Sequence, residues 1–492
     1  MADWKSLVTV HRAKQQDSIP SAWTLNDDKL KTLSGIGTAQ DGRLVELQVA
    51  RQSGLLSIKE LDITENHSAS SILQLIRAQE LTAEERAALA NQLTSCLTEI
   101  FFDEAIERAK SLDQTLRQTG QVVGPLNGLP ASFKDCFHIR NHYATAGFVE
   151  YLKRPPPTDD AALVKILVDA GAVLYCKTNV PQTMMTADSE NNIFGRTLNS
   201  IKSCLTAGGS SGGEGALVSF RGSVLGIGND LAGSVRIPAT CCGIYGFKPT
   251  ANRIPFGGQT HFPFPVPWLS SMLPVVGPLA HSAVLWNYDS TSLNIPWRRI
   301  DVKLTGRWPL VGWPKTLTIP CTPPSAVHLR KPSLSCAARD TTLPNCLLPP
   351  SEAPESVPES CTNFFCLGAD DTKDLWEVLG EPLVTSLSKV EQFHGLNVAR
   401  ASYAEAWKQT WLDNNLISAV PHDTFGVPIY TVMWSVLDYP AAVIPFSTAS
   451  KEKDGTSNAA AAPFTPDYTL DAIDSAPCSI QIVAPTLRDE EC

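Results

Sequence analysis

The chain has 492 residues, of which 43% are hydrophobic and 18% are charged. This composition suits a globular protein with a sizeable core, in one large domain or two to three ordinary ones. The net charge of −10 argues against nucleic acid or an anionic membrane as the main partner. No apolar run reaches the roughly 18 residues of a membrane span, and residues 1–20 contain no apolar core of a signal peptide. We therefore expect a cytoplasmic protein without a transmembrane segment.

The 13 cysteines do not form a recognisable framework, because their number is odd and no CxxC pattern occurs. In a chain of this length, such usage is typical of free thiols in a reducing compartment. We expect neither a disulfide scaffold nor a metal site.

Residues 81–120 are expected to form one helix. Thr82 and Glu85 are spaced as a capping box, and Gly120 is a stop signal. Between them, apolar residues keep helical spacing at Ala90, Leu93, Leu97, Ile100 and Phe101.

Strands and helices then alternate. Residues 131–137 predict a short strand that places Lys134 among apolar neighbours. Residues 159–180 predict a helix, a stop at Gly171 and a buried strand, and residues 241–259 predict a strand and a turn. This alternation indicates an α/β layer structure.

The second half of the chain changes character. Residues 303–366 are rich in proline and cysteine and show little periodicity, so we expect an irregular segment there. Helical patterns follow at residues 372–395 and 401–415, and residues 431–446 form an apolar segment that we expect to be buried.

The glycine-rich stretch from Thr206 to Thr240 admits several interpretations. Its glycines alternate with apolar residues, which favours packed turns over a flexible linker. The P-loop pattern is absent, and the dinucleotide pattern GxGxxG fails where Leu231 stands at its third glycine. Ser210 matches the GxSxG pattern of serine hydrolases. That pattern also requires a histidine downstream, and none of the five candidates has a compelling context: His261, His281, His328, His394 and His422.

Ser234 is a second candidate nucleophile. It follows a turn of small residues whose backbone N–H groups could converge on one point, as an oxyanion requires. A lysine can serve as base if burial keeps it neutral. Lys134, flanked by apolar residues, is compatible with this role.

Three segments in this order resemble the amidase signature family. They are "GPLNGLPASFKD" with Lys134, "GGSSGGEGALVSFRGS" with Ser210, and "NDLAGSVRIPATCCGIYGFKPT" with Ser234. The similarity is continuous over residues 122–250, and the whole chain most resembles the fungal acetamidase-like general amidases. The resemblance implies an α/β fold with a central mixed β-sheet flanked by helices on both faces. It also implies one amidase-signature domain over residues 62–487, with residues 1–61 as an N-terminal extension packed on it.

The resemblance also assigns roles to residues. Ser234 would be the acyl nucleophile, Ser210 the bridging serine after a cis Gly209–Ser210 bond, and Lys134 the base. Substrate-site positions would be Met184 and the oxyanion row of Leu231, Ala232, Gly233 and Ser234. The implied reaction is hydrolysis of the carbon–nitrogen bond of small aliphatic or aryl monocarboxylic amides. These are linear amides, and the bond that breaks is not a peptide bond. No cofactor or metal is implied, and the substrate is a small molecule. The sequence does not determine the oligomeric state, and a homodimer is left open.

Two departures leave alternatives open. The family usually has "DIGGS" where this chain has "DLAGS", so Ala232 would carry a strain cost of about 1 kcal/mol if its φ were positive. Residues 281–366 and the C-terminal end do not follow the family pattern. One alternative is a fatty-acid amide or ester hydrolase of the same family. Another is an inactive paralogue or a defective gene product that retains the motif.

Overall fold

The computed structural model describes residues 4–34, 47–77, 90–260, 273–282, 381, 414–415, 429–450, 474–484 and 486–489. The predicted irregular segment at 303–366 lies outside the described residues, as does the predicted helix at 372–395 apart from Glu381. The organisation into residues 1–61 and 62–487 stays a prediction.

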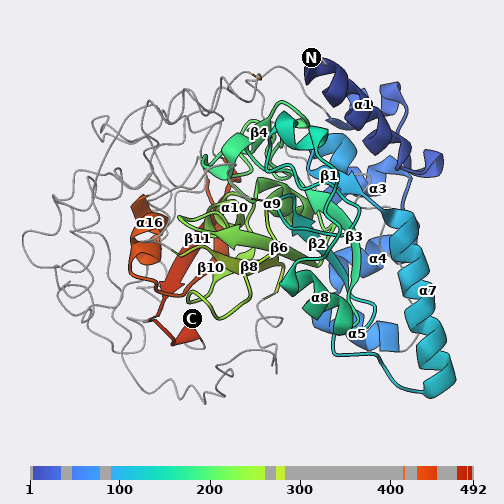
Figure 1. Ribbon diagram of the computed structural model, residues 1–492. Helices are drawn as coiled ribbons and strands as arrows, with labels where there is room; N and C mark the ends of the chain where they lie inside the picture. The colour runs from blue at the N-terminus through green and yellow to red at the C-terminus, as the bar shows by residue number, and fades with distance from the viewer. Residues whose placement is uncertain are drawn as a thin grey trace, which may run out of the picture.

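A nine-stranded mixed sheet forms the centre of the described structure (Figure 1), in the order β1-β3-β2-β6-β8-β7-β10-β11-β9. Strand β2 pairs in parallel with β3 and with β6, while the remaining neighbours are antiparallel. The strands are β1 (Leu97–Ile100), β2 (Pro130–Lys134), β3 (Val173–Thr178), β6 (Leu225–Asp230), β7 (Tyr245–Lys248), β8 (Val275–Ala280), β9 (Asn414–Asn415), β10 (Ala441–Thr448) and β11 (Pro477–Val483). A separate pair is formed by β4 (Glu190–Asn191) and β5 (Gly195–Arg196).

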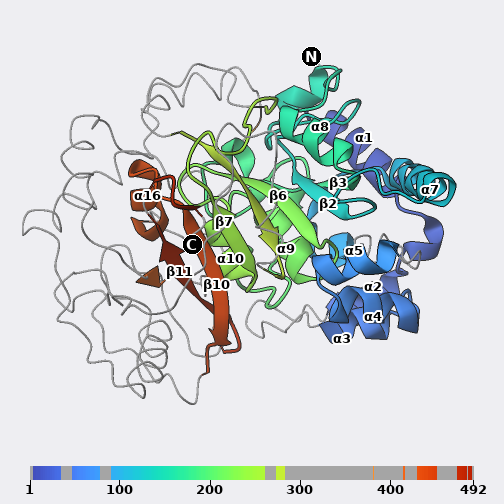
Figure 2. The same ribbon diagram turned by 90° about the horizontal axis from the view of Figure 1, so that it is seen from below.

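Helices of the N-terminal part lie at the β1 end of the sheet, and α16 lies near β10 and β11 at the other end (Figures 1 and 2). The described α-helices are α1 (Trp4–Asp17), α2 (Asp27–Ser34), α3 (Leu47–Ser53), α4 (Ile58–Asn66), α5 (Ala69–Arg77), α7 (Phe102–Thr119), α8 (Ala162–Asp169), α9 (Gly212–Ser219), α10 (Arg236–Cys241) and α16 (Ile429–Val436). Short 3-10 turns are η1 (Ser21–Trp23), η2 (Val149–Lys153) and η3 (Gln182–Met184).

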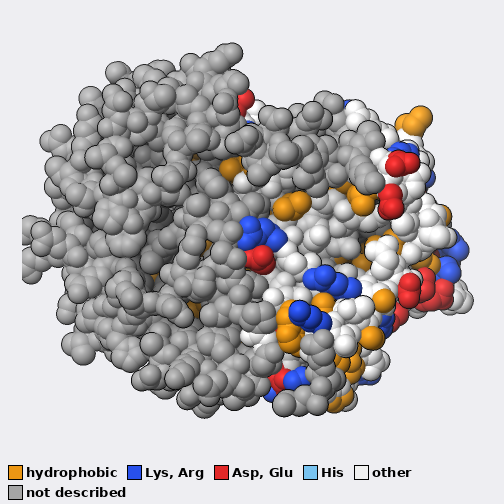
Figure 3. Space-filling model, turned by 90° about the horizontal axis from the view of Figure 1, so that it is seen from above, with side chains coloured by type: hydrophobic (Ala, Val, Ile, Leu, Met, Phe, Trp, Pro, Cys, Tyr) orange, Lys and Arg blue, Asp and Glu red, His pale blue; other side chains and the backbone are white. Residues whose placement is uncertain are grey.

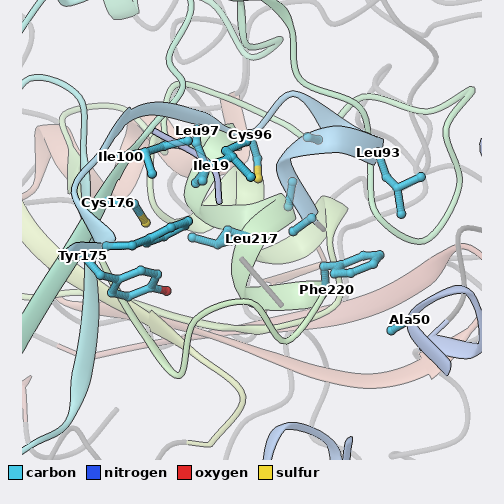
Figure 4. Close-up of a cluster of buried hydrophobic side chains, with 14 of the residues drawn as sticks. Ile19, Ala50, Leu93, Cys96, Leu97, Ile100, Tyr175, Cys176, Leu217 and Phe220 are labelled. Atoms are coloured by element: carbon cyan, nitrogen blue, oxygen red, sulfur yellow. The ribbon is translucent and has the colours of Figure 1, made fainter. Parts of the chain in front are cut away.

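Two hydrophobic clusters show that helices cover both faces of the sheet. One joins Tyr175 of β3 to Leu217 of α9 (Figure 4). The same cluster includes residues of α7 and α10. The other joins Phe133 of β2 and Ile227 of β6 to residues of α5 and α8. The expected α/β fold with a flanked mixed sheet is therefore confirmed.

The predicted elements around Lys134 are also confirmed. The strand at residues 131–137 is β2, and the helix, stop and strand at residues 159–180 are α8, Gly171 and β3. Gly171 has a φ of 92°, and an added Cβ would lie 2.7 Å from the backbone of Asn127, so this stop requires glycine. The predicted strand after residue 241 is β7, and residues 431–446 contribute buried parts of α16 and β10.

The single helix expected over residues 81–120 is wrong. Residues 97–100 form strand β1, which pairs with β3, and a separate helix, α7, begins at Phe102. All four residues of β1 are buried, because the strand packs on both faces. The apolar positions at Leu97 and Ile100 therefore matched helical spacing without forming a helix. Gly120 does end α7, with a φ of 68°.

Asn414 and Asn415, at the end of a predicted helix, instead pair with β11. The seven described cysteines are all free. None of the described helices is long and apolar enough to cross a membrane. On the face that Figure 3 shows, basic, acidic and apolar side chains are interspersed on the described surface.

Candidate active site

Lys134 ends β2, in the middle of the parallel part of the sheet, and its side chain is 0% exposed. Burial lowers the pKa of Lys134 to about 8, although Cys136 and nearby carboxylates oppose this shift. The Nζ atom lies 2.6 Å from Ser210 Oγ and 2.5 Å from Asn229 Oδ1. A buried amine with a lowered pKa and a hydroxyl within reach is suited to accept a proton.

Ser210 lies in the loop that leads into α9 and is 2% exposed. The peptide bond between Gly209 and Ser210 is cis, as the resemblance implies. A Cβ at Gly209 would lie 2.3 Å from the carbonyl oxygen of Thr186, so only glycine allows this close approach. The loop therefore packs directly against the segment that follows η3.

Ser234 lies on the turn between β6 and α10 and is half-buried. Its carbonyl oxygen accepts a hydrogen bond from the backbone N–H of Ser211, at 3.1 Å. This bond holds the backbone of the Ser234 turn against the Ser210 loop. Within the described residues, the Ser234 hydroxyl makes no hydrogen bond. Lys134 and Ser210 are thus linked by a hydrogen bond between their side chains. Ser234 is linked to the Ser210 loop by a backbone hydrogen bond.

The turn before Ser234 is organised by Asp230, a residue that sequence reasoning missed. Its carboxylate accepts hydrogen bonds from the backbone N–H groups of Gly233 at 2.8 Å, Val235 at 3.1 Å and Arg236 at 3.3 Å. The Gly233 N–H is therefore engaged, contrary to the expectation that it faces an oxyanion. The expected donors that remain are the N–H groups of Leu231, Ala232 and Ser234.

The substitution of alanine for glycine at 232 does not strain the turn. Ala232 is outside the positive-φ region, whereas Gly233 has a φ of 129°. A Cβ at Gly233 would lie 2.2 Å from Thr431 Oγ1, so glycine is required at 233 and not at 232. The Ala232 carbonyl instead accepts a hydrogen bond from Thr431 Oγ1, at 2.5 Å.

Arg236 connects this turn to the C-terminal part of the chain. It forms a buried ion pair with Asp230, with Nη2 2.9 Å from Oδ1. Although burial raises the pKa of Asp230, the charge of Arg236 and its hydrogen bonds lower it to about 2. The remaining guanidinium N–H groups donate to the Thr431 carbonyl, Ser435 Oγ and Gln481 Oε1. Helix α16 and strand β11 therefore support the turn that carries Ser234. The sequence around Asp230 and Arg236 could not indicate these contacts, because the partners of Arg236 on α16 and β11 lie about 200 or more positions later.

Met184 lies in η3, on a turn with unusual backbone angles. Met184 has a φ of 59° and Thr183 a φ of 74°, which β-branched and bulky residues rarely adopt. Such residues cluster at functional sites. The Met184 side chain is partly buried and packs beside Ala146 and Phe148.

Comparisons with known proteins identify the family to which the chain belongs. A sequence model of the family described as Amidase matches residues 81–288. An amidase of Gibberella moniliformis is 35% identical over 99% of this chain and 97% of its own length. The chain belongs to the amidase signature family of hydrolases.

Two further relatives extend the comparison. An acetamidase of Emericella nidulans is 37% identical over 61% of this chain and 55% of its own length. Among solved structures, a fatty acid amide hydrolase matches with a TM-score of 0.84 and 26% identity, covering 100% of this chain and 93% of that one. The described residues of the amidase contain no group of three or more His, Cys, Asp or Glu side chains that could hold a metal ion.

Proposed function

We propose that this amidase-family protein hydrolyses carboxylic acid amides through Lys134, Ser210 and Ser234. The observation that carries this proposal is the 2.6 Å separation of the buried Lys134 Nζ from Ser210 Oγ. A neutral amine there accepts the Ser210 proton, and Ser210 takes the proton of Ser234 as Ser234 attacks the amide carbonyl.

The proposed reaction then proceeds in two stages. Negative charge on the carbonyl oxygen is stabilised by the backbone N–H groups of Leu231, Ala232 and Ser234. The proton returns through Ser210 to the leaving amine, and the carbon–nitrogen bond breaks to leave an acyl group on Ser234. Water, deprotonated by the same relay, hydrolyses the ester to a carboxylic acid. This scheme calls on no cofactor. We also infer that Met184 lines the substrate site, supported by its position on a turn with unusual backbone angles.

Small aliphatic or aryl monocarboxylic amides are the proposed substrates, supported by the similarity to an acetamidase. Fatty-acid amides are the second candidate, because the fatty acid amide hydrolase structure covers the full chain at a TM-score of 0.84. Hydrolysis of a series of amides with increasing acyl length distinguishes them. We expect kcat/KM to be highest for short or aryl acyl groups; a maximum at long chains would reject the first candidate.

The test of the mechanism is labelling by a serine-reactive fluorophosphonate, together with turnover of simple amides. We expect wild type to be labelled and Ser234→Ala to lose labelling, with kcat lower by about 10⁴-fold or more. Ser111→Ala, which removes an exposed serine on α7, is the control and should behave as wild type. Folded wild type that is neither labelled nor active would establish the inactive paralogue.

We also infer that the protein acts in the reducing cytoplasm. The support is that the seven described cysteines are all free thiols, which is usual in a reducing compartment. The homodimer stays a prediction, which light scattering of the purified protein tests.

A further inference from the structure

Lys134 has a second hydrogen-bond partner besides Ser210. Its Nζ lies 2.5 Å from Oδ1 of Asn229, a residue of β6. A neutral primary amine has two N–H donors and one lone pair. When one N–H donates to Asn229 Oδ1, the amine is held in an orientation that lets the lone pair face the Ser210 hydroxyl. The partner is an uncharged acceptor, so it does not attract a third proton as a carboxylate would.

The Asn229 amide is itself held in one orientation. Its Nδ2 donates to Gln259 Oε1 at 2.8 Å and to Cys136 Sγ at 3.3 Å. Gln259 Nε2 in turn donates to the carbonyl oxygen of Phe256 at 2.8 Å. A backbone carbonyl can only accept a hydrogen bond, so it fixes which end of the Gln259 amide faces Asn229. This leaves Asn229 Oδ1 facing Lys134.

The thiol of Cys136 fits the same arrangement. It donates to Gln259 Oε1 at 3.3 Å, and burial raises the pKa of Cys136 to about 11, so it keeps its proton. From the Phe256 carbonyl to the Lys134 amine, each hydrogen bond therefore pairs a donor with an acceptor. No N–H group faces another N–H group, and no amide oxygen faces another oxygen.

We propose that Asn229 is a positioning residue that orients the neutral Lys134 amine toward Ser210, and that Gln259 fixes the amide of Asn229 for this purpose. The proposal rests on Lys134 being the base of the proposed function. It adds that the acceptor beside this base must be uncharged.

Charged and titratable groups around Lys134 set the background for this role. Asp135 and Cys136 follow it on the chain, Asp230 ends β6, and Glu214 lies on α9. The carboxylate of Asp230 is neutralised by Arg236, and Glu214 accepts hydrogen bonds from Ser132 and Thr178 hydroxyls. Burial raises the pKa of Glu214 to about 8, which favours its uncharged form at neutral pH.

The test compares the pH dependence of kcat/KM in Asn229→Asp and Asn229→Ala. A carboxylate at 229 stabilises the Lys134 ammonium, so the rising limb should move to higher pH by about one to three pH units. Activity of Asn229→Asp should fall at least about tenfold at pH 7 and recover at alkaline pH. Asn229→Ala should lower kcat without moving the limb upward. The control Asn141→Asp adds the same charge at an exposed position and should match wild type.

Two further measurements complete the test. Gln259→Leu should lower kcat less than Asn229→Ala does, with KM unchanged, since it frees the Asn229 amide to rotate but leaves the Asn229 side chain in place. The pKa of Lys134 is also measured without turnover by NMR of ¹⁵N-labelled lysines, assigned by the signal lost in Lys134→Ala. An unchanged Lys134 pKa in Asn229→Asp, or the same upward shift in Asn229→Ala, overturns the positioning role. Wild-type activity in Lys134→Ala overturns the proposed function instead.

Discussion

Lys134 and Lys248 are two buried lysines in different regions of the same sheet, and they differ in what they contact. Both are almost fully buried, and burial lowers the pKa of each to about 8. Lys248, on β7, donates to the carbonyl oxygens of Tyr439 at 3.0 Å and Pro249 at 3.2 Å, and its Nζ lies 4.0 Å from the carboxylate of Asp438. Lys134 instead faces the hydroxyl of Ser210 at 2.6 Å. A carbonyl has no proton to give, whereas a hydroxyl has.

The comparison teaches that burial prepares a lysine for base catalysis but does not by itself make a base. A third buried lysine, Lys177, supports the same view, because its Nζ donates to the carbonyl of Tyr143. Of these three lysines, only Lys134 has a partner that can deliver a proton. The other two hold backbone segments together.

The largest expected effect separates the first two lysines by function. Lys134→Met should lower kcat for a simple amide by about 10² to 10⁴-fold, because general base catalysis is lost. Lys248→Met should leave kcat unchanged but lower the free energy of unfolding, since two buried carbonyls lose their donor at about 1–3 kcal/mol each. Steady-state kinetics and denaturant unfolding measure both. Equal loss of kcat in the two variants would break the distinction.

The next largest effect concerns the buried ion pair of Arg236 with Asp230. Arg236→Leu leaves the Asp230 carboxylate buried without its cation and should cost about 3–5 kcal/mol of stability. Because the pKa of Asp230 is lowered to about 2, this contribution is present above about pH 4 and is lost as the pH falls toward about 2. Urea unfolding at pH 7 and at pH 3 measures it.

The matched control for that prediction is Arg253→Leu, which removes the other described buried arginine–aspartate pair, with Asp489 at 3.2 Å. It should lower stability while the fluorophosphonate labelling rate of the folded protein stays at the wild-type value. Arg236→Leu should lower both, since Arg236 supports the turn that carries Ser234. Loss of labelling in folded Arg253→Leu would contradict this assignment.

The smallest of these effects sharpens the role of the turn itself. Gly233→Ala forces a Cβ to within 2.2 Å of Thr431 Oγ1 at a φ of 129°. We expect labelling and turnover to be reduced but not abolished, with about 1–3 kcal/mol of backbone strain. Gly120→Ala is the matched control, because its φ is also positive, at 68°, but no atom lies within 4 Å of its added Cβ. Thermal unfolding and kinetics of both variants are the measurements, and normal turnover in Gly233→Ala would show that the turn adapts.

Local signals predicted the part of the fold that carries Lys134. The apolar run of β2, the amphipathic α8 and the stop at Gly171 all act over a few residues, so the sequence could indicate them. Strand β1 was mistaken for helix because its type is decided by pairing with β3, far along the chain. Local spacing carries no information about that partner.

The candidate site was predictable to a similar extent. The resemblance to the amidase signature family indicated Lys134, Ser210 and Ser234 as candidates, but not the use of the Gly233 N–H by Asp230. Nor could it indicate the hydrogen bond of Asn229 with the amide of Gln259, which lies on a loop 30 positions later. Contacts of Arg236 with residues about 200 positions later arise only from tertiary packing.

The most direct test of the central claim is the pH dependence of fluorophosphonate labelling in wild type and Lys134→Met. If neutral Lys134 activates Ser234 through Ser210, the wild-type rate constant should rise about tenfold per pH unit and level off above about pH 8. In Lys134→Met the rate should be lower and lack this limb. A folded Lys134→Met variant with the wild-type rate and pH profile would contradict the account.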